Sequence, residues 1–481
     1  MWIRRDGGYS ACMIPPQALP MRPMSPNSAP ESIALRAQAH PFIHAPNSTL
    51  ISMSLPVLLS LIAEPLTGLV DTAFISRLGS ISLAALGVGT VGLSGIFWIF
   101  SFLGIGTQTE VSQAFGRQSL RRVAEIGGLA LALAVVFGLL LLAAGLPLAA
   151  YFSSAMGAAD AVHGLATRYL RIRLWGAPAV LFTVAAFGIL RGLQDMRSPL
   201  WIALIINVLN IILDAVLIFG YGAIPALGVA GAALASVVSQ WIGALAAVFI
   251  LYRKIGLPAG IRVRDIQRLF NIGGEMFIRT GLATAFFVLT TRVATRMGPE
   301  AGAAHQAIRQ VWLFTTFLLD AYAVTAQSLV GFFMGPALRE QARRVAYYVF
   351  GWSAATGLAL ALMMVFGEGA VLTLLVPPTA AAVFAPAWIV CVVTQPVNAL
   401  AYATDGIHWG TGDFRFLRNV MLAATLCCGA AVFLLDETRS DAFTRLWRIV
   451  CAWIWIRAVF GVVRVWPGVG RSPLREDAGN T

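Results

Sequence analysis

The sequence predicts an all-α polytopic membrane protein with twelve transmembrane helices in two six-helix bundles, related by a pseudo-twofold axis along the membrane normal. Three observations support this prediction. Of the 481 residues, 58% are hydrophobic and only 12% are charged, and apolar runs of about 20 residues, the length that spans a bilayer, recur along the chain. A basic segment divides these runs into two sets of six. The two sets also share a repeat in their sequences.

The apolar runs begin near Thr49. Their lengths predict helices in the first half at about 49–75, 83–107, 124–150, 164–190, 199–220 and 229–252. In the second half they predict helices at about 272–296, 303–332, 345–366, 384–410, 416–435 and 446–466. The predicted first bundle therefore covers 48–252 and the second 272–466, joined by a basic linker over 253–271.

Two tails flank the bundles. Residues 1–47 are rich in proline, serine and alanine without an apolar period, so we expect a disordered tail that buries no core. Met13, Met21 and Met24 are alternative translation starts within it. Residues 467–481 form the second predicted tail.

Positive charges between the predicted helices are unevenly distributed, which sets the expected orientation. One side carries Arg117, Arg121, Arg122, Arg191, Arg197, Arg253, Lys254, Arg262, Arg264, Arg268, Arg339, Arg343, Arg344, Arg415 and Arg418. The other carries only Arg77, Arg168, Arg296, Arg439 and Arg445. The positive-inside rule places the first group and both termini in the cytoplasm. Loop cations thus account for the net charge of +12, and we expect no nucleic-acid partner.

The two halves repeat glycine, proline and aspartate positions at a nearly constant offset. Gly79 and Gly298 lie 219 residues apart, as do Gly116 and Gly335. The series Pro178, Gly188, Gly192 and Asp195 recurs 218 residues later as Pro396, Gly406, Gly410 and Asp413. Three matches in order indicate an internal duplication. Since each unit contains six helices, the units are parallel, an arrangement that encloses a substrate cavity between two moving bundles.

The first predicted helix carries two acids at bilayer depth. Glu64, Gly68 and Asp71 are spaced i, i+4, i+7, so both acids share one helix face. An acidic side chain there costs roughly 2.5–3.5 kcal/mol on insertion scales, and such residues are usually functional. Pro56 lacks an N–H and allows the helix to bend, which makes it a candidate hinge. A bendable helix beside titratable acids indicates ion-driven movement.

The fifth predicted helix supplies a third acid with two amides. Asn207, Asn210 and Asp214 are spaced i, i+3, i+7 on one face. Carboxylate and amide oxygens can hold a proton or a hard cation such as sodium. The alternative is a hydrogen-bond network that only joins helices. Thr290 and Val432 stand at the repeat positions of Asp71 and Asp214, so the acid pair is confined to the first half, which favours function over packing.

The second half has its own charged residues within helices, namely Arg279, Asp320, Asp405 and His408. Isolated charges there would be costly, so we expect pairing, with Arg279 and Asp320 the preferred couple. Asp405 and His408, spaced i, i+3, are either a second titrating site or a carboxylate next to a hydrogen-bonded core histidine.

At this point the chain resembles a known family. The segments PLTGLVDTAFISRLG, QAFG, YLRIRLWGAPAVL, GLQDMRSP, NVLNIILDAVLIFGYG, GVAGAALAS, LLDAYAVTAQSLVG, ATDGIHWGTGD and LRNVMLAA occur in order over roughly residues 49–466. This order resembles the multidrug and toxic compound extrusion (MATE) transporters, in particular their DNA-damage-inducible protein F branch. The resemblance implies a twelve-helix, V-shaped, two-lobed fold and export driven by a proton or sodium gradient. It also places Tyr322 and Gln327 near the substrate cavity, where Gln327 replaces an acid of some relatives.

Aromatic residues are candidates for an adaptable cavity lining, although lipid contact and helix packing explain such residues equally well. The candidates are Phe97, Trp98, Phe100, Trp175, Phe182, Phe187, Trp312, Phe314 and Tyr322. The five cysteines have neither metal-site nor disulfide spacing.

The favoured function is a secondary antiporter of a bacterial inner membrane that exports small organic compounds and needs no cofactor beyond an ion gradient. The sequence contains neither a P-loop nor an HExxH motif, and we expect a monomer without enzymatic activity. Alternatives are a lipid-linked precursor flippase, which should have a cationic cavity, and a membrane-embedded transferase, which should have a large extramembrane loop.

Overall fold

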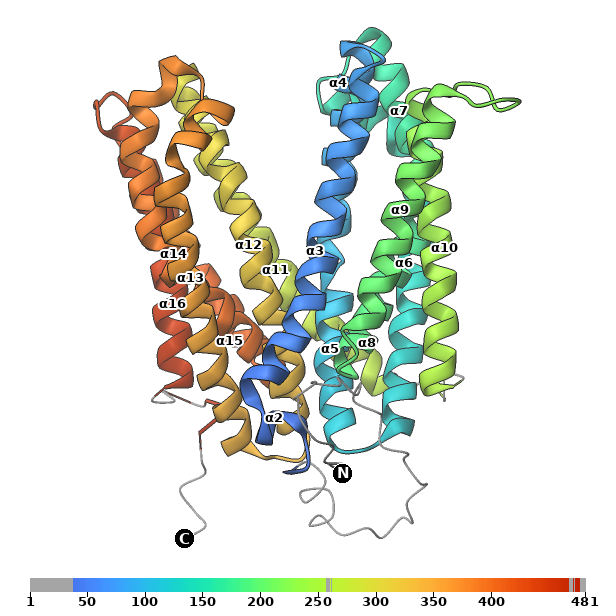
Figure 1. Cartoon of the computed structure of the whole chain (residues 1–481), viewed down its shortest axis with the longest axis vertical. Helices are drawn as coiled ribbons and strands as arrows, with labels where there is room; N and C mark the ends of the chain where they lie inside the picture. The colour runs from blue at the N-terminus through green and yellow to red at the C-terminus, as the bar shows by residue number, and fades with distance from the viewer. Residues whose placement is uncertain (1–37, 257–259, 261, 467–469, 471, 476–481) are drawn as a thin grey trace, which may run out of the picture.

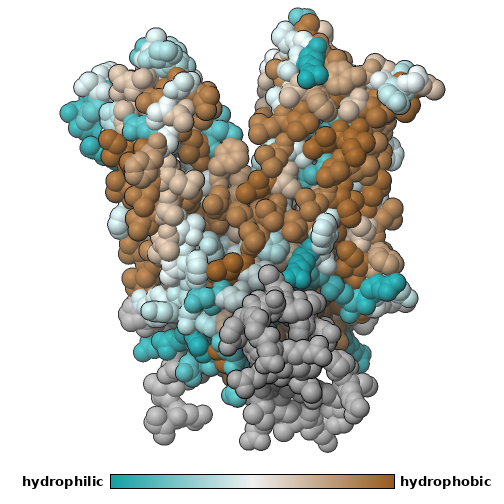
Figure 2. All heavy atoms as spheres, in the orientation of Figure 1, coloured by the Kyte–Doolittle hydropathy of each residue, from teal (hydrophilic) through white to brown (hydrophobic). Residues whose placement is uncertain are grey.

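The computed structural model describes residues 38–256, 260, 262–466, 470 and 472–475. It is almost entirely helical, and its helices form two bundles that splay apart into a V (Figure 1). Both termini lie where the bundles join, which we call the closed end; the opposite end is the open end. Hydrophobic residues cover the middle of both arms, whereas hydrophilic residues gather at the two ends (Figure 2). This distribution fits a protein that crosses a bilayer.

The first bundle contains six spans. A short helix α2 (Pro41–His44) precedes them, and the spans are α3 (Pro46–Ser76), α4 (Ser80–Ile99) with α5 (Ser101–Gly116), α6 (Leu120–Ala155), α7 (Asp160–Leu174) with α8 (Ala177–Gly192), α9 (Arg197–Phe219) and α10 (Val229–Ile255). The second span is interrupted at Phe100, and α7 and α8 are bent by 50°.

The second bundle repeats this order with unbroken helices. Its spans are α11 (Val263–Arg296), α12 (Pro299–Met334), α13 (Arg339–Leu375), α14 (Ala381–Thr411) preceded by η1 (Pro378–Ala380), α15 (Phe414–Phe433) and α16 (Ala442–Val465). With the bent α7–α8 pair counted as one span, the described chain has twelve helices or pairs long and apolar enough to cross a membrane. The predicted fold class is confirmed.

The backbone repeats at the same offsets as the sequence. Gly79 and Gly298, which precede the second span of each bundle, have φ angles of 99° and 119°, values that L side chains rarely adopt. Gln118 and Ala337, also 219 residues apart, have φ angles of 57° and 61°. The two bundles are therefore built around matching turns.

The repeated glycines mark two kinds of close contact. Within the bundles, a Cβ atom on Gly188 would lie 2.5 Å from the Gly104 carbonyl oxygen, and one on Gly406 would lie 2.2 Å from that of Ala323. Gly116 and Gly335 instead lie between the bundles, where a Cβ would come within 1.9 Å of the Phe332 oxygen and 2.2 Å of the Gln113 oxygen. These residues allow α5 and α12 to cross closely at the junction.

Two helices cross from one bundle to the other. The first half of α3 packs against α12 and α13 of the second bundle through Leu50, Met53 and Val57, whereas its second half lies along α9. The repeat-related helix α11 starts against α5, where Ile272 meets Gly106, and continues along α15. A movement of one bundle relative to the other therefore deforms α3 and α11.

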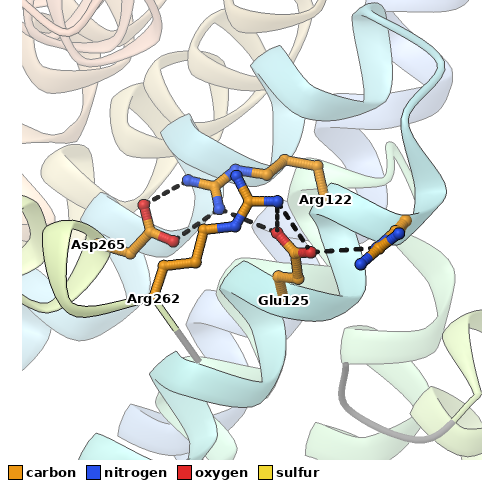
Figure 3. A network of polar contacts seen from close by, with 5 residues as sticks. Arg122, Glu125, Arg262 and Asp265 are labelled. Carbon is orange, nitrogen blue, oxygen red and sulfur yellow. Dashed lines mark hydrogen bonds and ion pairs between the residues drawn. The ribbon is translucent and has the colours of Figure 1, made fainter. Parts of the chain in front are cut away.

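Ion pairs join the bundles at the closed end (Figure 3). Arg122 of α6 pairs with Asp265 of α11, and Arg268 pairs with Glu110 at 2.8 Å. Arg262, just before α11, lies 3.2 Å from Glu125. These ion pairs stabilise the closed arrangement.

Two predicted boundaries are wrong. Residues 263–271 are not linker but the first turns of α11, because the charged residues that lower hydropathy there stabilise the helix through ion pairs with α5 and α6. Residues 41–47 are not disordered but form α2 and the start of α3. The predicted tail over 1–37 lies outside the described residues, as does most of 467–481.

Candidate ion-coupling site

The structure brings Asp71 and Asp214 together between α3 and α9. Their carboxyl groups lie within hydrogen-bonding reach of each other. Asp214 is 0% exposed, and neither of its oxygens, nor Asp71 Oδ1, has a hydrogen-bond donor in the described structure. Two negative charges in such a place are costly, so the pair requires a shared proton or a bound cation.

The other predicted members of this site lie around the pair without contacting it. Asn210 is 4% exposed, and its Nδ2 donates to Ser236 Oγ at 3.4 Å. Asn207 donates to the Ala203 carbonyl of its own helix at 2.7 Å. Glu64 is exposed on α3, two turns from Asp71. Asn210 therefore belongs to the immediate surroundings, whereas Asn207 is used within α9.

Arg173 of α7 supplies the positive charge that sequence reasoning missed. Its charge acts on Glu64, Asp71 and Asp214, and its Nη1 donates to Gln240 Oε1 at 3.0 Å. Tyr169, one turn away, is 2% exposed beside it. The segment YLRIRLWG gave a signal, but Arg173 lies at a helix end and resembled an ordinary membrane-surface cation.

The repeat-related positions in the second bundle hold no acid pair. Thr290 is fully buried, and its hydroxyl donates to the Phe287 carbonyl at 3.0 Å, while Val432 is a buried apolar residue. The acidic site is therefore one-sided, as the sequence comparison of the halves predicts.

The second bundle instead has a cationic cluster around Asp405 of α14. Asp405 pairs with Arg279 of α11 and with Arg457 of α16 at 2.7 Å, and both guanidinium groups lie over tryptophan rings. The expected pairing of Arg279 with Asp320 is wrong, because α11 and α16 both direct an arginine at α14.

Asp320 has a different electrostatic partner, Arg191 of the first bundle. The placement of Arg191 in a loop is also wrong: it lies in the last turn of α8, half-buried. Its Nη2 donates to Ser60 Oγ at 3.4 Å, and Ser328 of α12 donates to its carbonyl oxygen at 2.6 Å. Arg191 therefore contributes to the junction of the bundles rather than to their surface.

The remaining candidates of the second bundle are held in structural contacts. His408 is 2% exposed with Nε2 3.3 Å from the Gly461 carbonyl oxygen, which matches the core-histidine alternative. The Tyr322 hydroxyl accepts from Thr356 at 3.1 Å. Gln327 lies at the bundle junction rather than in the open cleft, where its Nε2 donates to the Ile105 carbonyl at 2.7 Å and to Thr109 Oγ1 at 2.9 Å.

The predicted hinge lies where α3 passes between the bundles. The helix is continuous through Pro56 and through a second proline, Pro65, next to Glu64. Ser54, close to Pro56, donates to Thr325 Oγ1 of α12 at 3.0 Å. Each proline removes one hydrogen bond from the helix, so α3 is weakest between its contacts with the two bundles.

The aromatic candidates divide between surface and packing. Trp98 and Trp175 are 59% and 58% exposed. Trp312 packs against Trp447, and Phe100 against Phe137.

The segment before α3 closes the junction from the closed end. His40 is buried against Phe332 and Phe333 of the second bundle, and its Nε2 lies 2.7 Å from Gln194 Oε1 of the first. Phe42 is fully buried beside Phe333 and Tyr348. This segment therefore contacts both bundles.

Acidification is expected to release this segment. Burial lowers the pKa of His40, although the hydrogen bond to Gln194 opposes the shift. The contact is thus fully present above the ordinary histidine pKa of about 6.5 and weakens as the pH falls below it. Hydrogen exchange of residues 40–50, corrected for intrinsic rates, should be faster at low pH. His40→Gln, which cannot titrate, should remove this pH response and exposed His44→Gln should not; an unchanged response in His40→Gln would contradict the prediction.

Comparison with known proteins identifies the family. The MatE family model matches residues 56–216 and 276–433, one stretch in each bundle. The chain belongs to the MatE family. MatE proteins are multidrug efflux transporters, so the resemblance seen in the sequence is confirmed.

Several relatives match most of this MatE chain. Protein DETOXIFICATION 44, chloroplastic, of Arabidopsis thaliana is 30% identical over 86% of this chain and 81% of its own length. DNA damage-inducible protein F of Escherichia coli is 28% identical over 84% and 89%. A probable multidrug resistance protein NorM of Deinococcus radiodurans is 30% identical over 84% and 85%. A crystal structure of MATE in the bent conformation has a TM-score of 0.81 at 20% identity, covering 88% of this chain and 96% of that one.

Proposed function

We propose that this MatE protein is a secondary active antiporter that exports organic, lipophilic or cationic compounds in exchange for protons or sodium. The observation that supports it most is the Asp71–Asp214 pair, whose buried oxygens lack donors and whose helix α3 contacts both bundles. A proton or a cation at this pair removes the charge repulsion, and the resulting change in α3 reaches the junction directly. No cofactor takes part, and the protein catalyses no chemical reaction.

The proposed orientation has both termini and the cation-rich closed end in the cytoplasm of a bacterial inner membrane, with the protein acting as a monomer. The V then opens outward (Figure 1), and substrate leaves by this route. Return to an inward-open state requires the closed-end ion pairs of Figure 3 to separate. Because Arg279 and Arg457 are neutralised by Asp405, a cationic flippase cavity is less well supported.

Proteoliposomes test this function. The purified protein, loaded with the fluorescent lipophilic cation ethidium, is expected to move the dye against its gradient when a proton or sodium gradient is imposed. Transport that is driven by neither ion, or that proceeds equally with no gradient, would contradict antiport.

Replacing Pro56 by alanine is expected to slow turnover without removing ion binding. Alanine restores the missing helix hydrogen bond and straightens α3 where it leaves the second bundle. Dye transport in proteoliposomes measures turnover, and proton release from detergent-solubilised protein measures ion binding. Pro147→Ala in α6 is the matched control, since it also replaces a proline inside a helix. Wild-type turnover in Pro56→Ala would exclude this proline as the hinge.

A further inference from the structure

An unassigned groove lies on the second bundle near the closed end. It has a volume of about 570 Å³ and lies between α13, α16 and the first turn of α3. Asn47 of α3 accepts a hydrogen bond from Trp352 Nε1 at 3.0 Å at its edge, and Trp466 stacks on Phe350 at 4.7 Å beside it. Tyrosine and tryptophan are typical of the level at which a bilayer meets water.

The middle of the groove is formed by small residues. Gly351 and Ala355 lie one turn apart on α13 and line it. A Cβ atom on Gly351 would meet no heavy atom within 4 Å, so the glycine faces open space. An apolar channel of this kind, flanked by aromatic rings, has the chemistry to hold a hydrocarbon chain.

Positive charge is concentrated at the closed-end side of the groove. Arg339, Arg343 and Arg344 lie in the first two turns of α13, with Glu340 as the acid among them. Arg344 is exposed and has no ion pair among the described residues. It lies four residues before Tyr348 and seven before Gly351, so it shares the helix face that lines the groove. Basic pockets between membrane helices bind anionic lipid head groups.

We propose that this groove binds one anionic phospholipid from the leaflet at the closed end. Its phosphate lies at Arg344, and one acyl chain runs over Gly351 and Ala355 beside Trp466. Because Asn47 belongs to the first turn of α3, the bound lipid also joins α3 to α13. The lipid thus strengthens the contact by which α3 is held to the second bundle.

Native mass spectrometry tests this site with the full-length protein. The protein is purified in detergent with equimolar phosphatidylglycerol and phosphatidylcholine, and retained lipids are counted. Wild type is expected to retain one phosphatidylglycerol preferentially. Gly351→Leu fills the groove without a steric clash and should abolish its retention. Arg344→Gln should reduce retention about fivefold.

Matched controls separate the site from general effects. Gly369→Leu adds the same side chain to α13, at a glycine that also faces open space, and Arg197→Gln removes an exposed cation at the closed end of the other bundle. Both should retain phosphatidylglycerol as wild type does. If Gly351→Leu unfolds, Ala355→Leu takes its place. Equal retention of the two lipids by wild type, or wild-type retention in both Arg344→Gln and the groove-filling variant, overturns the proposal.

Discussion

Asp71→Asn is expected to abolish ion-coupled export while leaving folding and membrane abundance nearly intact. The amide keeps the shape of the carboxyl group but cannot take up a proton, so the Asp71–Asp214 pair no longer changes charge. Asp214→Asn and the double variant should show a similar loss, because removing either member disables a shared site. Resistance of a drug-sensitive host, normalised to membrane abundance, measures export.

Proton release distinguishes one shared site from two independent ones. Adding substrate to the detergent-solubilised protein should release protons from wild type but from none of the three variants. Asp160→Asn, at an exposed acid in the first turn of α7, should behave as wild type. Full release by Asp214→Asn would mean that Asp71 acts alone, and additive losses would mean two separate sites.

Asp405→Asn is expected to destabilise the second bundle strongly. The carboxylate neutralises two arginines whose side chains are 12% and 10% exposed. Removing one partner of a buried ion pair costs about 3–5 kcal/mol, because the remaining charge is left uncompensated. Thermal unfolding in detergent should show a clear decrease in midpoint temperature.

Two further variants make this second prediction specific. Asp441→Asn removes an acid that pairs with the exposed Arg439 and Arg445, so the midpoint should not change. Adding Arg457→Leu to Asp405→Asn removes one of the two uncompensated charges and should recover part of the loss. A midpoint for Asp405→Asn equal to that of Asp441→Asn would show that the cluster contributes nothing to stability.

The acid pair was accessible to sequence reasoning for a physical reason. Asp71 and Asp214 are intramembrane charges on two helices of one repeat unit, and the other unit holds threonine and valine at the same positions. The partner of Arg279 was not accessible, because helical spacing gives the face of a residue but not which helix lies opposite. Arg173 was overlooked because hydropathy treats a cation at a helix end as a surface residue. The early start of α11 depends on ion pairs with distant segments, which local sequence does not contain.

The interruptions in the second and fourth spans of the first bundle have a mechanical consequence. A break or a bend leaves backbone groups without helix partners and lets the two segments rotate separately. The corresponding helices α12 and α14 are continuous and largely buried. The bundle with the acid pair is therefore compliant, whereas the other is a stiff frame. A change in charge at Asp71 and Asp214 will deform the compliant bundle first, so that α4, α5, α7 and α8 rearrange against a nearly stationary support.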